Sequence, residues 1–159
     1  MISGVAPEFD LAALTGGRQS LQDLLASGPL LLVFFKASCP TCQLTFPFLE
    51  RLHRGKAADG PQIVAVSQDD AATTRNFNLR FGISLPVLLD PLGDPGTAGY
   101  PASNAYGITN VPTLFLIELD GRISLSVTGF ERAEMERLGV RFGVQLFTPA
   151  DRVPVFQPG

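Results

Sequence analysis

An unbroken apolar run at residues 30–36, "LLLVFFK", constrains the fold of this chain more than any other feature. A strand with one face in water alternates apolar and polar side chains, whereas six apolar residues follow one another here before the lysine. That pattern is typical of a strand buried on both faces, which occurs mainly where helices cover both sides of a sheet. The run therefore predicts a central strand between two layers of helices.

Strand-like and helix-like segments alternate along the rest of the chain. Residues 40–54 carry the apolar stripe of a helix, "IVAVS" at 63–67 is a second buried strand, and Asp-Gly at 120–121 marks a hairpin turn. We also expect a strand, a Gly-Gly turn and a short helix in residues 9–25, a helix ending before Gly82, a strand at 86–90, a loop at 91–102, and helices at 103–106 and 132–142. This order predicts an α/β fold with a central mixed β-sheet flanked by helices, extended by an N-terminal β-hairpin.

Length and composition fit one globular domain over residues 1–159. The chain is 45% hydrophobic and 17% charged, which suffices for a sizeable core. We expect that core in residues 7–142, and a tail at 143–159 without regular structure of its own. The net charge is −3 and the 12 lysines and arginines are scattered, so we expect no nucleic-acid partner. No apolar stretch approaches the ~20 residues of a membrane span.

The first ten residues, "MISGVAPEFD", have neither a basic start nor the apolar core of an export signal. The sequence as written therefore predicts a cytoplasmic protein. A chain trimmed of its leader would read the same, so an extracytoplasmic location stays open.

Both cysteines of the chain lie where the apolar run gives way to the first long helix, in the order Cys39, Pro40, Thr41, Cys42. Pro40 suits the first helical position, so Cys39 falls at the N-cap, where free N–H groups and the helix dipole stabilise a thiolate. A spacing of three brings Cys42 onto the same side of the helix. The arrangement predicts a nucleophile and a resolving thiol for thiol–disulfide exchange, with Pro40 and Thr41 tuning the reduction potential.

Two other interpretations of the cysteine pair are weaker. Structural zinc usually takes four ligands. The chain has two cysteines and one histidine, so a zinc site would need carboxylates or a second chain. Two inert core cysteines are the other alternative. We therefore predict no metal and no cofactor beyond a redox-active Cys39–Cys42 disulfide.

At this point the sequence resembles the thioredoxin-like superfamily, and more closely its TlpA-like branch, which overlaps the AhpC/TSA redoxins. The resemblance rests on "PEFDLAALTGGRQSLQDL", "VFFKASCPTCQLTFPFLERL", "IVAVSQDD", "FGISLPVLLDPLG" and "YGITNVPTLFLIELDGRI". It implies a thioredoxin-like fold, a kink at Pro47 in the active-site helix, and a cis Pro112 beside the cysteines. It also implies that the backbone of Val111 is free to pair with a client strand.

The chain departs from this family pattern at several positions. Ser38 replaces the usual tryptophan, Val33 replaces the buried acid of thioredoxins, and Thr45 replaces the glutamate of many TlpA-like proteins. Deprotonation of the second cysteine must therefore use water or another group. Lys36 ends the apolar strand near the helix start, where its ammonium would favour a Cys39 thiolate by charge attraction. A solvated strand-end lysine is the alternative interpretation.

Three functional hypotheses follow. The leading one is a thiol–disulfide oxidoreductase that acts on protein clients as a reductant and is recharged by an electron-donor protein. The second is a peroxiredoxin-like thiol peroxidase, although the threonine and proline of that motif fall at Lys36 and Leu32. The third is a non-catalytic binding module that holds a partner segment, suggested by the apolar residues of the tail.

Overall fold

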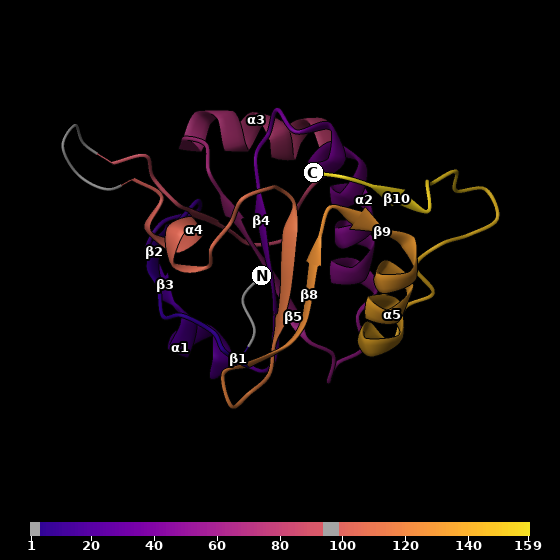
Figure 1. Cartoon of the computed structure of the whole chain (residues 1–159), viewed down its shortest axis with the longest axis horizontal. Helices are drawn as coiled ribbons and strands as arrows, with labels where there is room; N and C mark the ends of the chain where they lie inside the picture. Colours follow the sequence, from indigo (N-terminus) through magenta and orange to yellow (C-terminus); the bar gives the residue numbers. More distant parts are fainter. Residues whose placement is uncertain (1–3, 94–98) are drawn as a thin grey trace.

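A computed structural model describes residues 4–93 and 99–159 of the chain. In these ranges the strands of the main sheet follow the order β1-β8-β7-β4-β5-β6-β2-β3 (Figure 1). The strands are β1 Gly4–Val5, β2 Asp10–Ala13, β3 Arg18–Ser20, β4 Leu30–Phe35, β5 Gln62–Ser67, β6 Val87–Leu89, β7 Thr113–Ile117 and β8 Arg122–Thr128. Strands β4, β5 and β6 are parallel, whereas β7 runs antiparallel to β4, so the sheet is mixed as expected.

The helices are α1 Leu21–Leu25, α2 Pro40–Gly55, α3 Ala71–Phe81, α4 Pro101–Ala105 and α5 Arg132–Phe142. Every side chain of β4 is buried, as the apolar run predicted. Alternate residues of β4 enter two cores: one face packs with α2, α3 and α5, and the other with α1 and α4. In the part of the chain that the structure describes, none of these helices is long and apolar enough to cross a membrane.

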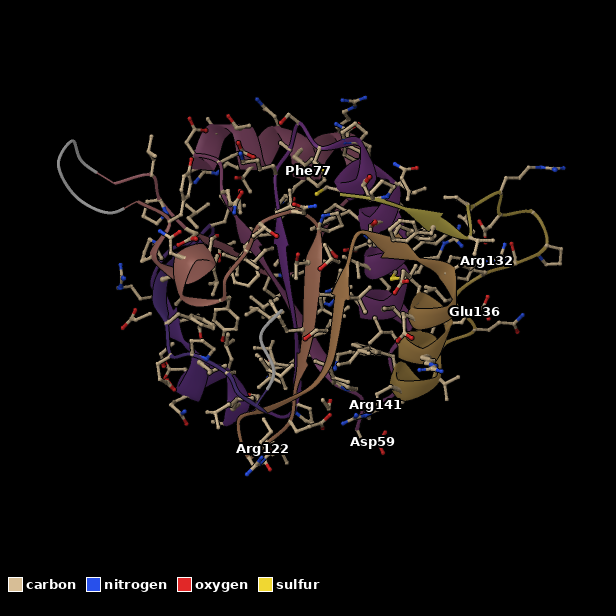
Figure 2. All side chains as sticks on the ribbon, in the orientation of Figure 1. Asp59, Phe77, Arg122, Arg132, Glu136 and Arg141 are labelled. Carbon is tan, nitrogen blue, oxygen red and sulfur yellow. The ribbon has the colours of Figure 1, made fainter. Side chains whose placement is uncertain are left out.

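An aromatic cluster fixes the first half of α2 against the end of the central strand. Phe35 of β4 lies 4.4 Å from Phe46 of α2 and 5.1 Å from Phe77 of α3, measured between ring centroids. Figure 2 shows Phe77 between α3 and the sheet, while Arg122 and Arg132 lie at the periphery. Offset and edge-to-face ring pairs stabilise a core beyond their area burial. The start of α2, which carries the cysteines, is therefore held on a rigid base.

Local signals placed most element boundaries well. The β2–β3 hairpin forms around the Gly-Gly turn, and α3 is capped by Asp70 and ends at Gly82, which has a left-handed φ of +65°. Helix α4 begins at Pro101, two residues earlier than expected, because the buried carboxylate of Asp90 accepts hydrogen bonds from its first amides. The loop predicted at 91–102 lies partly outside the described residues.

The expectation for the tail was wrong. Its segment β10 (Phe156–Gln157) pairs antiparallel with β9 (Phe130–Glu131) in a separate two-stranded sheet. No local signal predicts this pairing, because prolines flank β10 and its partner lies about 25 residues earlier. Figure 1 shows the C-terminal end of the chain beside the start of α2. The tail therefore approaches the cysteine pair.

Candidate functional site

Cys39 caps the N-terminus of α2. Its backbone is extended, with φ −81° and ψ 117°, and its Sγ accepts a hydrogen bond from the amide of Cys42 at 3.2 Å. Pro40 occupies the first turn, where its missing N–H costs no helical hydrogen bond. The expected arrangement of cap and proline is confirmed. At this position the amide of Cys42, at the N-terminus of α2, points at the Cys39 sulfur.

Cys42 is fully buried, whereas Cys39 is half-buried, and no disulfide joins them in this structure. Burial raises the pKa of the Cys42 thiol far above its ordinary value, and the nearby Cys39 and the charge of Asp69 raise it further. A thiol that is exposed enough to attack lies beside a thiol that stays protonated until it is needed, which suits their expected roles as nucleophile and resolving thiol.

Pro112 lies beside the pair, and the Val111–Pro112 bond is cis. The carbonyl oxygen of Val111 accepts a hydrogen bond from the Sγ of Cys39 at 3.2 Å. Pro112 is buried, while Val111 is half-buried. The expected geometry of this loop is therefore confirmed. That the backbone of Val111 pairs with a client remains a prediction.

Lys36 is exposed and makes no hydrogen bond or ion pair through its side chain among the described residues. It lines a polar cavity of about 240 Å³ together with Asn110 and Val111, next to the cis-proline loop. Its effect on Cys39 stays a prediction. Thr45, at a family glutamate position, donates its hydroxyl to the carbonyl of Thr41 at 2.7 Å, so it is committed to the helix.

Asp69 was missed as a site residue. Its Oδ2 accepts the amide of Ala37 at 2.7 Å, which ties the loop after β5 to the loop that carries Cys39. The next residue, Asp70, is the N-cap of α3. The available signal was the pair of acidic residues after β5, the strand that neighbours β4 and so lies near the cysteines. Asp69 is a positioning residue with a negative charge close enough to affect Cys42.

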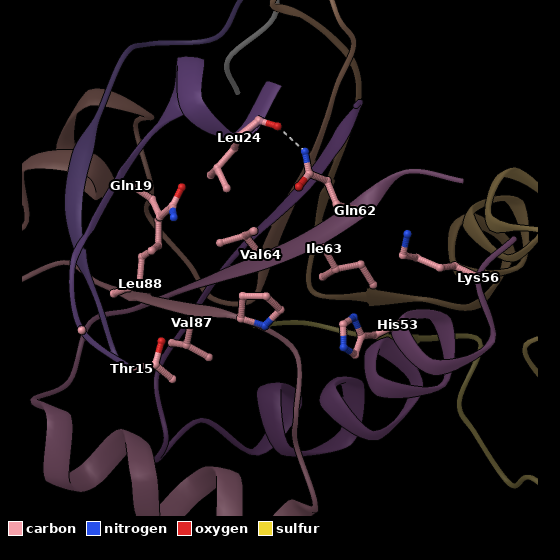
Figure 3. A pocket seen from close by; sticks show the side chains of 13 residues that line it. Thr15, Gln19, Leu24, His53, Lys56, Gln62, Ile63, Val64, Val87 and Leu88 are labelled. Atoms are coloured by element: carbon pink, nitrogen blue, oxygen red, sulfur yellow. Dashed lines mark hydrogen bonds between the residues drawn. The ribbon is translucent and has the colours of Figure 1, made fainter. Parts of the chain in front are cut away.

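A second cavity, of about 250 Å³, lies near the opposite end of α2 from the cysteines (Figure 3). His53 and Lys56 line one side, and the start of β5 with Val87 lines another. His53 is half-buried there. This cavity contains neither cysteine. Within residues 4–93 and 99–159, no three side chains of His, Cys, Asp or Glu gather as metal ligands.

The comparisons with known proteins agree with this geometry. Residues 2–126 match the AhpC/TSA family model. The thiol-disulfide oxidoreductase ResA of Bacillus subtilis (strain 168) is 31% identical over 125 residues, which cover 78% of this chain and 65% of that protein. ResA of Bacillus anthracis is 28% identical over 130 residues, which cover 81% of this chain and 70% of that protein.

The fold recurs in solved structures. A Chlorobium tepidum protein, described as a thiol:disulfide interchange protein DsbE, superposes with a TM-score of 0.75 at 29% identity, covering 89% of this chain and 95% of that one. The chain therefore belongs to the AhpC/TSA family, as a TlpA-like redoxin of the thiol–disulfide oxidoreductase class.

Proposed function

We propose that this protein reduces disulfides in protein clients. The Cys39 thiolate attacks one sulfur of a client disulfide, forming a Cys39–client mixed disulfide and releasing the other client sulfur as a thiolate. Cys42 then loses its proton, attacks the Cys39 sulfur and releases the second client thiolate. Two electrons pass to the client, and the protein is left with a Cys39–Cys42 disulfide. No bound cofactor takes part.

One observation carries this proposal: the sulfur of Cys39 sits at the helix N-cap, 3.2 Å from both the amide of Cys42 and the carbonyl of Val111. Burial keeps Cys42 protonated, because it raises the pKa of that thiol. A resolving thiol that is protonated at neutral pH does not compete with Cys39 for the client. The first attack is therefore assigned to a single sulfur.

The direction of exchange and the partners belong to the proposal. Each cycle leaves the cysteine pair oxidised, so two electrons must return to it before the next cycle. We expect an electron-donor protein to supply them. The compartment remains a prediction as well: its thiol poise decides which direction the exchange takes. The polar cavity beside Lys36 and Val111 would receive a client side chain next to the disulfide.

Reduction of insulin by dithiothreitol tests the proposal. The protein should accelerate precipitation of the insulin B chain, whereas Cys39→Ser should give only the rate of dithiothreitol alone. An equilibrium titration against glutathione then gives the reduction potential, and a value near that of protein reductants rather than oxidants is expected. Equal rates for the protein and Cys39→Ser would refute the proposal.

A further inference from the structure

The tail of the chain makes direct contact with the residues between the two cysteines. The side-chain amide of Gln157 donates to the hydroxyl of Thr41 at 2.9 Å, and that hydroxyl donates to the carbonyl of Pro158 at 2.6 Å. Thr41 is only 3% exposed, although it directly follows the exposed Pro40 in the first turn of α2. Its burial is therefore explained by the tail that bonds to it.

The same segment reaches the residue before the cis-proline. A Cβ atom built on Gly159 would lie 2.2 Å from the carbonyl oxygen of Val111, so only a glycine fits there without movement. On the adjoining side, a Cβ on Gly129 would lie 2.6 Å from the carbonyl oxygen of Gln157. Two glycines, Gly159 in the tail and Gly129 between β8 and β9, thus permit close backbone approaches at this end of the tail.

We infer that residues 156–159 occupy the client-binding groove of the protein and that a client strand must displace them. This inference rests on the proposed function, because it concerns the groove beside the same two cysteines. The groove is bounded by Thr41 and by the backbone of Val111. The tail fills it as an extended segment that accepts a hydrogen bond from Thr41 and places a residue without a side chain against Val111.

The way the tail is anchored makes such displacement local. Upstream, Asp151 forms a two-pronged ion pair with Arg51, with N–O distances of 2.7 and 3.0 Å, and Val153 packs on the core. Farther along, Val155 and Phe156 are 67% and 53% exposed, and β10 is only two residues long. The end of the segment can therefore leave the groove while its base stays attached.

The tail residues that fill the groove also indicate which client segments would fit it. A matching client is an extended segment with a backbone carbonyl opposite Thr41 and a glycine or another small residue opposite Val111. Two neutral hydrogen bonds correspond to a preference of roughly 5- to 150-fold for the closed state, in which the tail occupies the groove, over the open state, in which it has left. The apparent affinity for a client falls by the same factor, because only the open fraction can bind.

The test compares the full-length protein with a variant that lacks residues 156–159 and with Gln157→Ala. Arg152→Ala is the matched control, since Arg152 is an exposed tail residue without a hydrogen bond or ion pair among the described residues. Thermal unfolding verifies the fold of each variant. The readout is the rate at which reduced Cys39 reacts with a bulky polymer-linked maleimide, relative to its rate with iodoacetamide.

We expect this ratio to rise at least fivefold without residues 156–159, to rise roughly two- to tenfold for Gln157→Ala, and to stay unchanged for Arg152→Ala. A peptide of residues 153–159 added to the shortened variant should lower the ratio again. An unchanged ratio in the folded, shortened variant would overturn the inference. Because alkylation needs no turnover, it decides this question even if insulin reduction fails, which would refute the proposed function alone.

Discussion

The buried Cys42 thiol predicts a specific pH dependence for closure of the protein's disulfide. Closure requires the Cys42 thiolate, and burial raises the pKa of that thiol far above the ordinary cysteine value of about 8.5. When Cys39 is part of a mixed disulfide, it raises the Cys42 pKa less. Burial, which is the largest cause of the raised pKa, remains. The thiolate fraction should then rise tenfold with each pH unit throughout the accessible range.

The contrast with an ordinary thiol is largest at alkaline pH. For a pKa of about 8.5, the thiolate fraction rises only about threefold between pH 8 and pH 9, because the thiol is then half titrated. For a pKa well above 9, it rises about tenfold over the same interval. Each pKa unit above the ordinary value corresponds to about 1.36 kcal/mol that disfavours the thiolate.

Stopped-flow reaction with an aromatic disulfide that releases a coloured thiolate measures this directly. The first release reports attack by Cys39, and the second reports attack by Cys42 on the mixed disulfide. The rate of the second phase should rise about tenfold between pH 8 and pH 9, whereas Cys42→Ser should lack this phase. A second phase that levels off between pH 8 and 9 would refute the account, because Cys42 would then titrate like a solvated thiol.

Asp69→Asn is a matched perturbation for the same assay. The asparagine keeps an acceptor for the amide of Ala37 but removes the charge that raises the Cys42 pKa. The second phase should therefore be faster than in the wild type at each pH. A slower second phase would instead identify the Asp69 carboxylate as the base that accepts the Cys42 proton.

Three further outcomes are expected. Glu50→Ala should lower the free energy of urea-induced unfolding by about 2–4 kcal/mol, because the buried carboxylate accepts the amides of Ser84 and Leu85; a loss within error would contradict this. Lys36→Met should slow iodoacetamide alkylation of Cys39 a few-fold at low salt, and an unchanged rate would leave Lys36 with a solvated role. Hydrogen peroxide should oxidise Cys39 no faster than a free thiol in stopped-flow measurements, and a rate far above that would favour the peroxidase hypothesis.

Much of the site could be predicted because its signals are local. The apolar run identified β4, the proline after Cys39 marked the helix start, and the spacing of the cysteines identified them as a redox pair. The cis bond at Pro112 came from family resemblance rather than from the residues alone. Helix capping and burial along a strand depend on residues within a few positions of one another, so both can be predicted from a single sequence.

The contacts that were missed join distant segments. Asp69 and Ala37 are 32 residues apart, and Thr41 and Pro158 are 117 apart. No periodicity or turn signal encodes such pairs. The prolines around β10 even argued against a strand, because proline cannot donate to a ladder, and only the pairing with β9 makes this segment a strand.

Trapping of the mixed disulfide tests the central claim most directly. Cys42→Ser and Cys39→Ser are each reduced and incubated with a peptide that contains one disulfide, and the covalent products are read by mass spectrometry. Cys42→Ser should accumulate an adduct at Cys39, because the resolving thiol is gone, while Cys39→Ser should form little adduct through its buried Cys42. An adduct that forms mainly on Cys42 would contradict the assignment of nucleophile and resolving thiol.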